Sequence, residues 1–254
     1  MIHLDKFRVM AMFQFFFVAA ASAVAAQSNH DPDRSYYPAP KAKQAPVVDG
    51  VADEAAWERA QWRQIEHLWL GPEMSNADFQ GRYKVVWTEH KLYILAEIVD
   101  DILIDTHRNP LEQYWDDDCL EIFVDEDHSG GEHQYNHNAF AYHLSLDNQA
   151  IDIGTDKQAR SYTSHVESRW QQHGDKLTWE VSIDIYSDDY RDGSTDNRPT
   201  ILVAGKILGF MLAYCDNDGS KLRENFIGSE YASGNDKDRG YIDAGLFGAL
   251  ELVE

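Results

Sequence analysis

Apolar and polar residues alternate over several short stretches of the chain, with the period of two that is typical of half-buried β-strands. Two such stretches, FQGRYKVVW and KLYILAEIV, lie within residues 79–99 and are joined by a short polar link, so they predict a hairpin. The same pattern predicts further strands at 119–124, 139–146, 150–154, 164–170, 176–185, 207–215 and 245–253. Long stretches with a helical period are absent from the sequence. The chain is therefore predicted to be all-β, an antiparallel two-sheet β-sandwich.

The stretch 114–127, YWDDDCLEIFVDED, combines an aromatic start, a run of carboxylates and an alternating strand. One face of this strand is aliphatic and is predicted to enter the core: Leu120, Ile122 and Val124. The other face carries Glu121 between Cys119 and Phe123, and a buried carboxylate needs either a partner or solvent. A ligand-facing sheet surface would meet that need. The alternative interpretation is an acidic turn in front of an ordinary half-buried strand.

The first 26 residues have the features of an export signal. Lys6 and Arg8 precede an apolar, Phe-rich stretch, and small residues at 23–26 offer a cleavage site. The apolar stretch is short for a membrane span, so we expect a soluble protein without membrane insertion, either periplasmic or secreted. Residues 27–45 contain several prolines and no periodicity, and are predicted to be a flexible leader. The domain is then expected at 46–254, with one short N-terminal helix within Val47–Trp57.

Acidic residues dominate the charge of the chain. There are 44 Asp and Glu against 22 Lys and Arg, which gives a formal net charge of -22, and loss of Asp5, Lys6 and Arg8 with the signal would make it -23. Such a surface repels phosphate backbones, so nucleic acid is not expected as a partner. Neutral ligands or divalent cations suit this field better, although solubility alone also accounts for it.

Two cysteines and an aspartate-rich turn leave alternatives open. Cys119 and Cys215 fall in predicted strands, where export would permit a disulfide and two buried thiols are the alternative. The segment 216–219, DNDG, resembles the beginning of a calcium loop and makes Asp216 and Asp218 candidate calcium ligands. No downstream glutamate completes an EF-hand, and a plain Asx turn is the alternative.

Five segments, taken in order, resemble carbohydrate-binding module family 9. They are VDGVADEAAW (48–57), VVWTEHKLYILAEIVDD (85–101), WDDDCLEIFVDED (115–127), LTWEVSIDI (177–185) and GFMLAYCDND (209–218). Each segment is unspecific alone, and their order and spacing carry the resemblance. It implies a jelly-roll β-sandwich that holds a mono- or oligosaccharide and structural calcium. It also implies an exported, non-catalytic protein that supports polysaccharide catabolism, with a glycoside hydrolase as a partner.

The resemblance also implies site residues, because members of the family grip a terminal sugar between two aromatic side chains. Trp115 matches the first aromatic and Glu121 the carboxylate that binds a hydroxyl. This chemistry is sensible, since pyranose faces stack on indole and a charged acceptor binds hydroxyls strongly. The second aromatic departs from the family pattern: where a tryptophan is expected, KLRENFIGSEY (221–231) offers Phe226 or Tyr231. The candidate polar contacts in that segment are Arg223 and Asn225.

Two other functions stay open at this point. The first is a glycoside hydrolase, or an accessory to one. Hydrolysis needs two carboxylates at a defined separation, but this chain is so rich in acidic residues that the presence of such a pair neither supports nor excludes it. A haem-binding electron-transfer domain needs axial ligands such as Met74 or Met211, but such residues are more typical of core packing. The sequence holds no GxSxG, HExxH or CxxCH motif. His133 and His137 have the spacing of a zinc pair in glycine-rich surroundings that favour a loop, and His143 is interpreted as a surface histidine.

Overall fold

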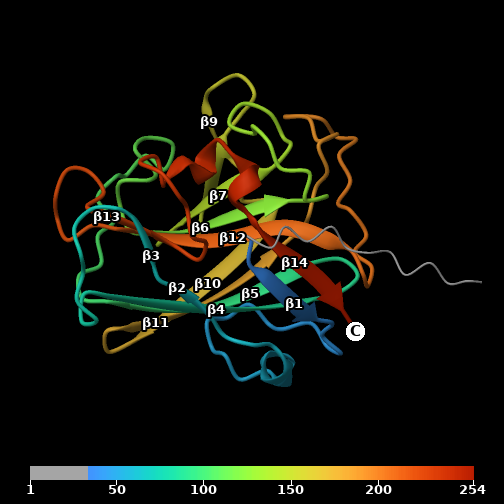
Figure 1. The fold of residues 1–254 in the computed structure, drawn as a ribbon, viewed down its shortest axis with the longest axis horizontal. Coiled ribbons are helices and arrows are strands. Elements are labelled where there is room, and N and C mark those ends of the chain that lie inside the picture. Colours follow the sequence, from blue (N-terminus) through green and yellow to red (C-terminus); the bar gives the residue numbers. More distant parts are fainter. Residues whose placement is uncertain (1–33) are drawn as a thin grey trace, which may run out of the picture.

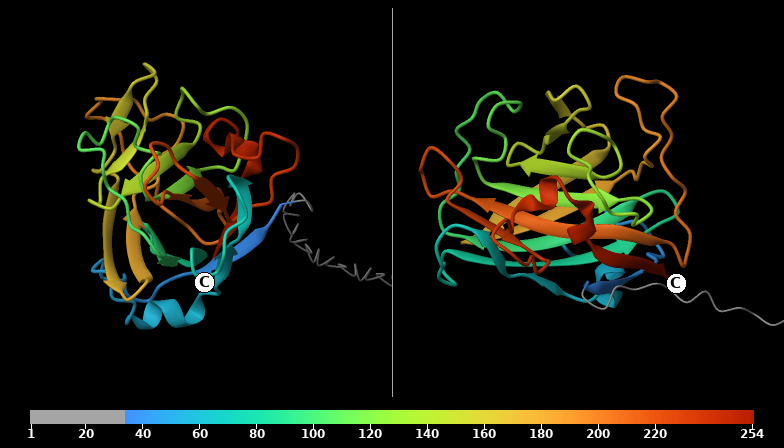
Figure 2. Two further views of the ribbon diagram at one scale, coloured as in Figure 1. Left: turned by 90° about the vertical axis from the view of Figure 1, so that its left-hand side faces the viewer. Right: turned by 45° about the horizontal axis from the view of Figure 1, so that its top comes forward.

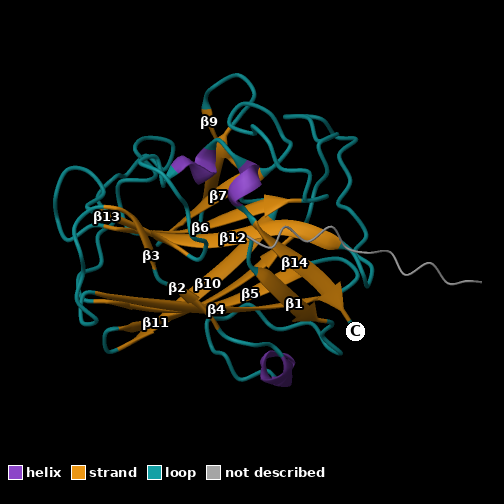
Figure 3. Ribbon diagram, in the orientation of Figure 1, coloured by secondary structure: helices purple, strands orange, loops and turns teal. Residues whose placement is uncertain are grey.

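The computed structural model describes residues 34–254, which form two β-sheets stacked face to face (Figure 1). The predicted export signal and residues 27–33 of the predicted leader lie outside the described residues. Helical structure in the described part is confined to short 3-10 helices, and strands and loops make up the rest (Figure 3). No helix within 34–254 is long and apolar enough to cross a membrane. The prediction of an all-β sandwich is confirmed.

Sheet A is the larger sheet, with nine strands. Seven of them follow the order β1-β14-β12-β6-β7-β8-β9, and β13 pairs with both β12 and β3. Neighbours are antiparallel except β1 and β14, which run parallel. The strands are β1 (Tyr36–Pro40), β3 (His67–Leu70), β6 (Cys119–Asp125), β7 (Phe140–Ser145), β8 (Ala150–Ile153), β9 (Ala159–Ser161), β12 (Ile207–Asp216), β13 (Asn225–Gly228) and β14 (Gly248–Val253).

Sheet B has five antiparallel strands in the order β10-β11-β5-β4-β2. They are β2 (Arg63–Ile65), β4 (Phe79–Trp87), β5 (Leu92–Asp100), β10 (Val166–His173) and β11 (Lys176–Ile183). The hairpin predicted within 79–99 is β4 and β5, which pair from Phe79 opposite Asp100 to Trp87 opposite Leu92. Short polar links let these strands fold back on each other. The two sheets, which Figure 2 shows from two further sides, approach each other closely at one side, where Ala42, just after β1, donates its backbone N–H to Trp87 O of β4 at 2.8 Å.

The main core lies between the two sheets, where alternate side chains of each strand meet. Leu120, Ile122 and Val124 of β6 point into it, as their spacing predicts. They pack in one cluster with the fully buried Trp87 and Trp179 of sheet B. Each aliphatic side chain buried in this way contributes about 1.5–3 kcal/mol of transfer free energy.

A second apolar cluster covers part of the outer face of sheet A. Cys119 and Phe123 of β6 and Met211 of β12 belong to it, together with Leu246 and Phe247. The last two come from the segment that contains helices η2 (Arg239–Tyr241) and η3 (Ala244–Leu246), which lie above sheet A in Figure 1. Because both faces of β6 are covered, all seven of its residues are buried.

Cys119 and Cys215 lie directly opposite each other on β6 and β12, within this second cluster. Both are free cysteines and both are buried. Of the two alternatives that the sequence leaves open, the structure therefore contains the pair of buried thiols.

The predicted short N-terminal helix is η1 (Ala55–Arg59), a single 3-10 turn outside sheet B (Figure 1). Trp57 of this helix packs against Val86 and Leu95 on the outer face of that sheet. Its indole nitrogen also donates to Glu180 Oε1 at 3.0 Å. The helix thus caps sheet B and takes no part in the outer face of sheet A.

The prediction of a flexible leader over residues 27–45 is wrong for Tyr36–Pro40, which form strand β1 against β14. Tyr37 and Ala39 of this strand are buried in the main core. The prolines of this stretch are compatible with a strand, because β1 is the edge strand of sheet A and an edge strand tolerates residues that lack an N–H donor.

Gly228 at the end of β13 allows a close approach of Trp69 that no larger residue would permit. A Cβ atom at position 228 would lie 1.9 Å from Cζ2 of Trp69, whose indole donates to Glu230 O at 2.9 Å. We expect Gly228→Ala to lower the free energy of unfolding by about 1–3 kcal/mol through overpacking, as measured by urea denaturation. In a Trp69→Ala background the same change should cost clearly less; equal costs in both backgrounds would contradict this packing.

Candidate functional site

A pocket of about 410 Å³ opens on the outer face of sheet A, next to the second apolar cluster. Its size lies within the range of roughly 300–1,000 Å³ that small-molecule sites occupy. Strands β6, β7, β8 and β13 contribute to it, and loops complete it. The lining residues are Tyr114, Trp115, Glu121, Gln134, Tyr135, Ala141, His143, Asp152, Ile153, Arg223, Phe226, Asp238 and Tyr241.

Glu121 and His143 form an ion pair among the lining residues. They lie directly opposite each other on β6 and β7, and His143 Nε2 is 3.2 Å from Glu121 Oε1. The other ring nitrogen, Nδ1, is 3.1 Å from Ala141 O. Both ring nitrogens therefore face atoms that only accept hydrogen bonds, which is the arrangement of an imidazolium beside a carboxylate. The sequence asks for a partner to the buried Glu121, and His143 is that partner.

The surroundings of His143 favour its charged form. Burial alone would lower the pKa of the imidazole, but the charge and hydrogen bond of Glu121 outweigh burial and raise the pKa to about 9. The interpretation of His143 as a surface histidine is wrong, since it is buried between Glu121, Tyr114 and Ala141. Residues directly opposite each other on neighbouring strands point to the same face of a sheet, so His143 points into the pocket as Glu121 does. The sequence alone does not show that β7 is the neighbour of β6.

Asp152 of β8 adds a third buried ionisable group to the pocket. Its carboxylate accepts hydrogen bonds from the backbone N–H groups of Ala141 at 2.8 Å and Ile153 at 2.7 Å. Burial nevertheless raises the pKa of this carboxyl to about 7. Near neutral pH it can therefore act toward a ligand as either an acceptor or a donor.

Arg223 reaches the pocket from the loop between β12 and β13. Its guanidinium carbon lies 3.9 Å from the ring centroid of Phe226, and its Nη1 is 3.2 Å from Cys215 Sγ. This stacking covers Phe226, which is only 2% exposed and so presents no open aromatic face. Arg223 and Phe226 are both predicted to contact the sugar, and of these two side chains Arg223 is the one that a ligand can reach.

The acidic run after Trp115 holds this loop in place. Asp116 accepts the backbone N–H of Arg223 at 3.1 Å, and Asn217 Nδ2 donates to the Asp116 carbonyl at 2.6 Å. Asp118 accepts the backbone N–H of Asn217 at 2.8 Å. The carboxylates that precede β6 thus fix the loop that carries Arg223, a role distinct from contact with a ligand.

Exposed aromatic rings border the pocket. Trp115 is 41% exposed and Tyr241 is 42% exposed, in contrast to the strand residues beneath them. Tyr114 supports Trp115 edge to face, with 4.8 Å between the ring centroids. Amphipathic rings of this kind offer flat apolar surfaces for stacking.

The structure brings four of the five predicted binding residues together: Trp115, Glu121, Arg223 and Phe226. Asn225 is placed elsewhere, because its side chain is buried and donates to Pro72 O at 2.7 Å. Tyr231, the alternative second aromatic, is 68% exposed and packs on His67 outside the pocket. The lining residues that the sequence did not predict to bind a ligand are Tyr114, Gln134, Tyr135, Ala141, His143, Asp152, Ile153, Asp238 and Tyr241.

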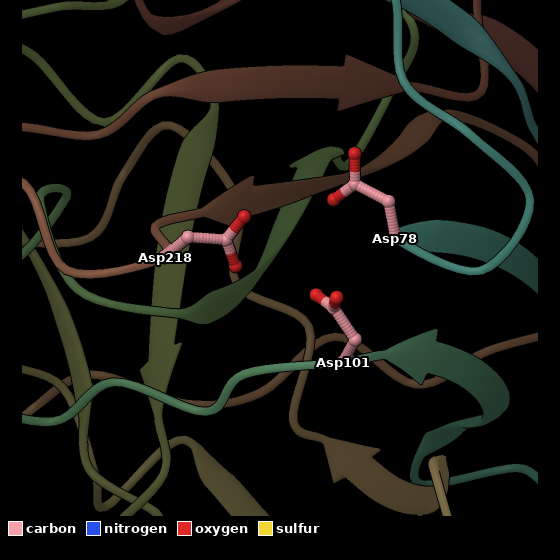
Figure 4. Close-up of side chains that lie close together, drawn as sticks. All are labelled: Asp78, Asp101 and Asp218. Atoms are coloured by element: carbon pink, nitrogen blue, oxygen red, sulfur yellow. The ribbon is translucent and has the colours of Figure 1, made fainter.

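The two predicted calcium ligands fall in separate carboxylate clusters. Asp216 joins Asp100 and Asp118, all three buried, and Asp218 joins the more exposed Asp78 and Asp101. Figure 4 shows the carboxylates of the second cluster pointing toward a common centre. In each cluster the candidate ligand atoms lie within 4.8 Å of one another.

The buried cluster has an unbalanced charge within the described residues. Burial and the neighbouring carboxylates raise the pKa of Asp118 to about 9 and that of Asp216 to about 8. Asp100 accepts from Tyr214 Oη at 2.6 Å and Asp118 from Ile104 N at 2.5 Å. Within 34–254 no donor reaches the carboxylate of Asp216, although this residue is only 2% exposed. Carboxylate oxygens are the ligands that hard divalent cations such as Ca²⁺ prefer, so this group of three aspartates has the chemistry of a divalent-cation site.

Comparison with solved structures agrees with the observed fold. A carbohydrate binding module family 9 from Caldicellulosiruptor kristjanssonii, solved in complex with cellotriose, superimposes with a TM-score of 0.64 at 18% identity. The superposition covers 86% of this chain and 94% of that module. The complex of that module with glucose gives a TM-score of 0.63. At this level of identity the similarity shows a common β-sandwich.

Comparison of sequences defines the family. The family model described as "Carbohydrate family 9 binding domain-like" matches residues 48–254, so the chain belongs to this family of carbohydrate-binding modules. An exoglucanase, XynX, from Acetivibrio thermocellus is 29% identical over 211 residues, which is 82% of this chain and 16% of the relative. An endo-1,4-beta-xylanase A from Thermotoga maritima is 35% identical over 81 residues, 32% of this chain and 7% of the relative. The chain thus spans a small fraction of these relatives.

The Glu121–His143 pair generates a prediction about stability and pH. We expect His143→Leu to lower the free energy of unfolding by about 3–5 kcal/mol at pH 6.5, because it leaves a buried carboxylate without its partner. The pKa of His143 is raised from 6.5 to about 9 in the folded protein. The stability that this histidine contributes is therefore complete below pH 6.5 and is lost as the pH rises through 9. The difference between wild type and variant in urea denaturation should therefore narrow over this range.

The exposed His173, at the end of β10, provides the matched control. His173→Leu should change the unfolding free energy by no more than about 0.5 kcal/mol. Equal effects of the two substitutions, or a difference for His143→Leu that does not depend on pH, would contradict the ion pair.

Proposed function

We propose that the pocket on the outer face of sheet A binds a mono- or oligosaccharide through aromatic stacking on Trp115 and polar contacts from Glu121 and Arg223. The observation that carries this proposal is an exposed indole beside a buried, ion-paired carboxylate. Trp115 offers a flat apolar face. Glu121 Oε1 pairs with His143, and Oε2, whose neighbour is the weak donor Cys215 Sγ at 4.0 Å, keeps lone pairs that can accept a hydroxyl. Membership of the family and the sugars bound by its solved relative support the same assignment.

We further propose that the protein is exported and serves polysaccharide catabolism alongside a glycoside hydrolase. The basic, apolar and small-residue pattern of the first 26 residues supports export to the periplasm or the medium. The xylanase and exoglucanase relatives support the association with polysaccharide breakdown.

Replacement of Trp115 tests the site directly. Trp115→Ala should weaken binding of cellotriose or glucose by at least about tenfold in isothermal titration, because a stacking tryptophan contributes upwards of about 1.4 kcal/mol. The melting temperature should change little, since the side chain is 41% exposed. Tyr231→Ala, an exposed aromatic outside the pocket, is the control and should bind as wild type does. Equal affinities of wild type and both variants would refute the site.

Calcium is proposed as a structural ion of this protein, held by Asp100, Asp118 and Asp216. Oxygens that share a Ca²⁺ at about 2.4 Å lie no more than about 4.8 Å apart, and the three carboxylates of this cluster meet that condition. The ion would neutralise their mutual repulsion and supply the partner that Asp216 otherwise lacks. The cluster of Asp78, Asp101 and Asp218 could hold a second ion with more water in its coordination shell.

Thermal unfolding with and without a chelator tests the calcium proposal. Saturating Ca²⁺, at about 100 times its Kd, should stabilise the protein by about 2.7 kcal/mol and raise Tm by roughly 5–10 °C over the chelated form. Asp216→Asn should remove most of this shift, whereas Asp236→Asn, in an exposed loop outside both clusters, should leave it unchanged. A Tm that is indifferent to chelator would count against the ion.

A further inference from the structure

Two cationic side chains line the pocket: His143 is paired with Glu121, and Arg223 is paired with no carboxylate among the described residues. Glu121 and His143 face each other as carboxylate and imidazolium, so their charges compensate. Asp152 is occupied by two backbone N–H groups and is only partly ionised at neutral pH, because burial raises its pKa to about 7. Asp238 is half-buried beside Tyr241, where solvent weakens its field.

Arg223 itself has no acidic partner. Among residues 34–254, no carboxylate oxygen lies within 4.0 Å of its guanidinium nitrogens. Its polar contact is Cys215 Sγ at 3.2 Å, and one flat face of the group rests on Phe226. A guanidinium carries five N–H donors in a fixed fork, so most of its donors stay free for a ligand.

Cys215 satisfies only part of this cation, because it contacts a single guanidinium nitrogen. Burial opposes ionisation of its thiol, although the hydrogen bond from Cys119 and the charge of Arg223 outweigh burial and lower its pKa. Sulfur is a weak acceptor and occupies one N–H of the five.

We propose that the pocket accepts an acidic sugar, either a free hexuronic acid or an oligosaccharide that ends in one. This inference rests on the proposed sugar site. The fork of Arg223 would bind the carboxylate in a bidentate manner, the arrangement that guanidinium favours. Trp115 would stack on the ring of the sugar, and Glu121 would accept a hydroxyl. Arg223 is then the residue that determines specificity for anionic over neutral sugars.

Glucuronic acid and glucose form the matched pair of probes, since they differ only in the group at C6. In isothermal titration of the wild-type protein near pH 7.5, glucuronate should bind at least about tenfold more tightly than glucose, as a charge-assisted bidentate contact implies. The preference should shrink between 50 mM and 500 mM NaCl, because salt screens a charge pair that solvent can reach.

Substitution of Arg223 assigns the preference to a residue. In Arg223→Gln the ratio of the two affinities should fall to about one or below, and Arg223→Lys should keep part of it. Near-ultraviolet circular dichroism confirms that each variant is folded. Lys157→Gln is the matched control, because Lys157 is a nearby cation on Tyr135 that does not line the pocket, and this variant should keep the ratio.

The outcomes separate this inference from the proposed function. If glucose binds in a Trp115-dependent manner as tightly as glucuronate or more tightly, the inference fails and the sugar site stands. If the preference exists but survives Arg223→Gln, or is lost in Lys157→Gln, the assignment to Arg223 fails. Absence of binding for both probes and for longer neutral and acidic oligosaccharides would overturn the sugar site as well.

Discussion

The ion pair between Glu121 and His143 makes a polar pocket possible on the outer face of a strand whose residues are all buried. Strand β6 is covered on one face by sheet B and on the other by the segment around η2 and η3, so a carboxylate in its middle would be strongly disfavoured alone. His143, opposite on β7, compensates that charge and holds one of its oxygens. The other oxygen has only the weak donor Cys215 Sγ, at 4.0 Å, and lies in the pocket that Trp115, Arg223 and Asp152 also line.

The carboxylates that precede β6 connect the pocket with the neighbouring acidic clusters. Asp116 fixes the backbone of Arg223, and Asp118 fixes Asn217 while it also belongs to the buried trio with Asp100 and Asp216. A cation bound by that trio would therefore order the same loop that delivers Arg223. The proposed calcium ion would act on the site through this loop, without contact with the sugar.

The fold follows from the sequence because side-chain alternation fixes which residues of each strand enter the core. Leu120, Ile122 and Val124 illustrate this, and the same alternation places Glu121 on the outer face. What the sequence conceals is contact between distant segments. His143 as the partner of Glu121, Tyr241 at the pocket and the separation of Asp216 from Asp218 all depend on which strands and loops become neighbours. Strand β1 was missed for a different reason, since its prolines are compatible with an edge strand.

The most direct test of the account is to map saccharide contacts on the folded protein by NMR. In ¹H–¹⁵N spectra titrated with glucose, cellotriose and glucuronic acid, we predict that at least one of these sugars shifts the indole N–H of Trp115 and the backbone signals of Glu121, His143 and Arg223. The indole signals of Trp57 and Trp62, outside the pocket, should remain in place. Shifts concentrated on the outer face of sheet B, or no shift with any of the three sugars, would contradict a sugar site on sheet A.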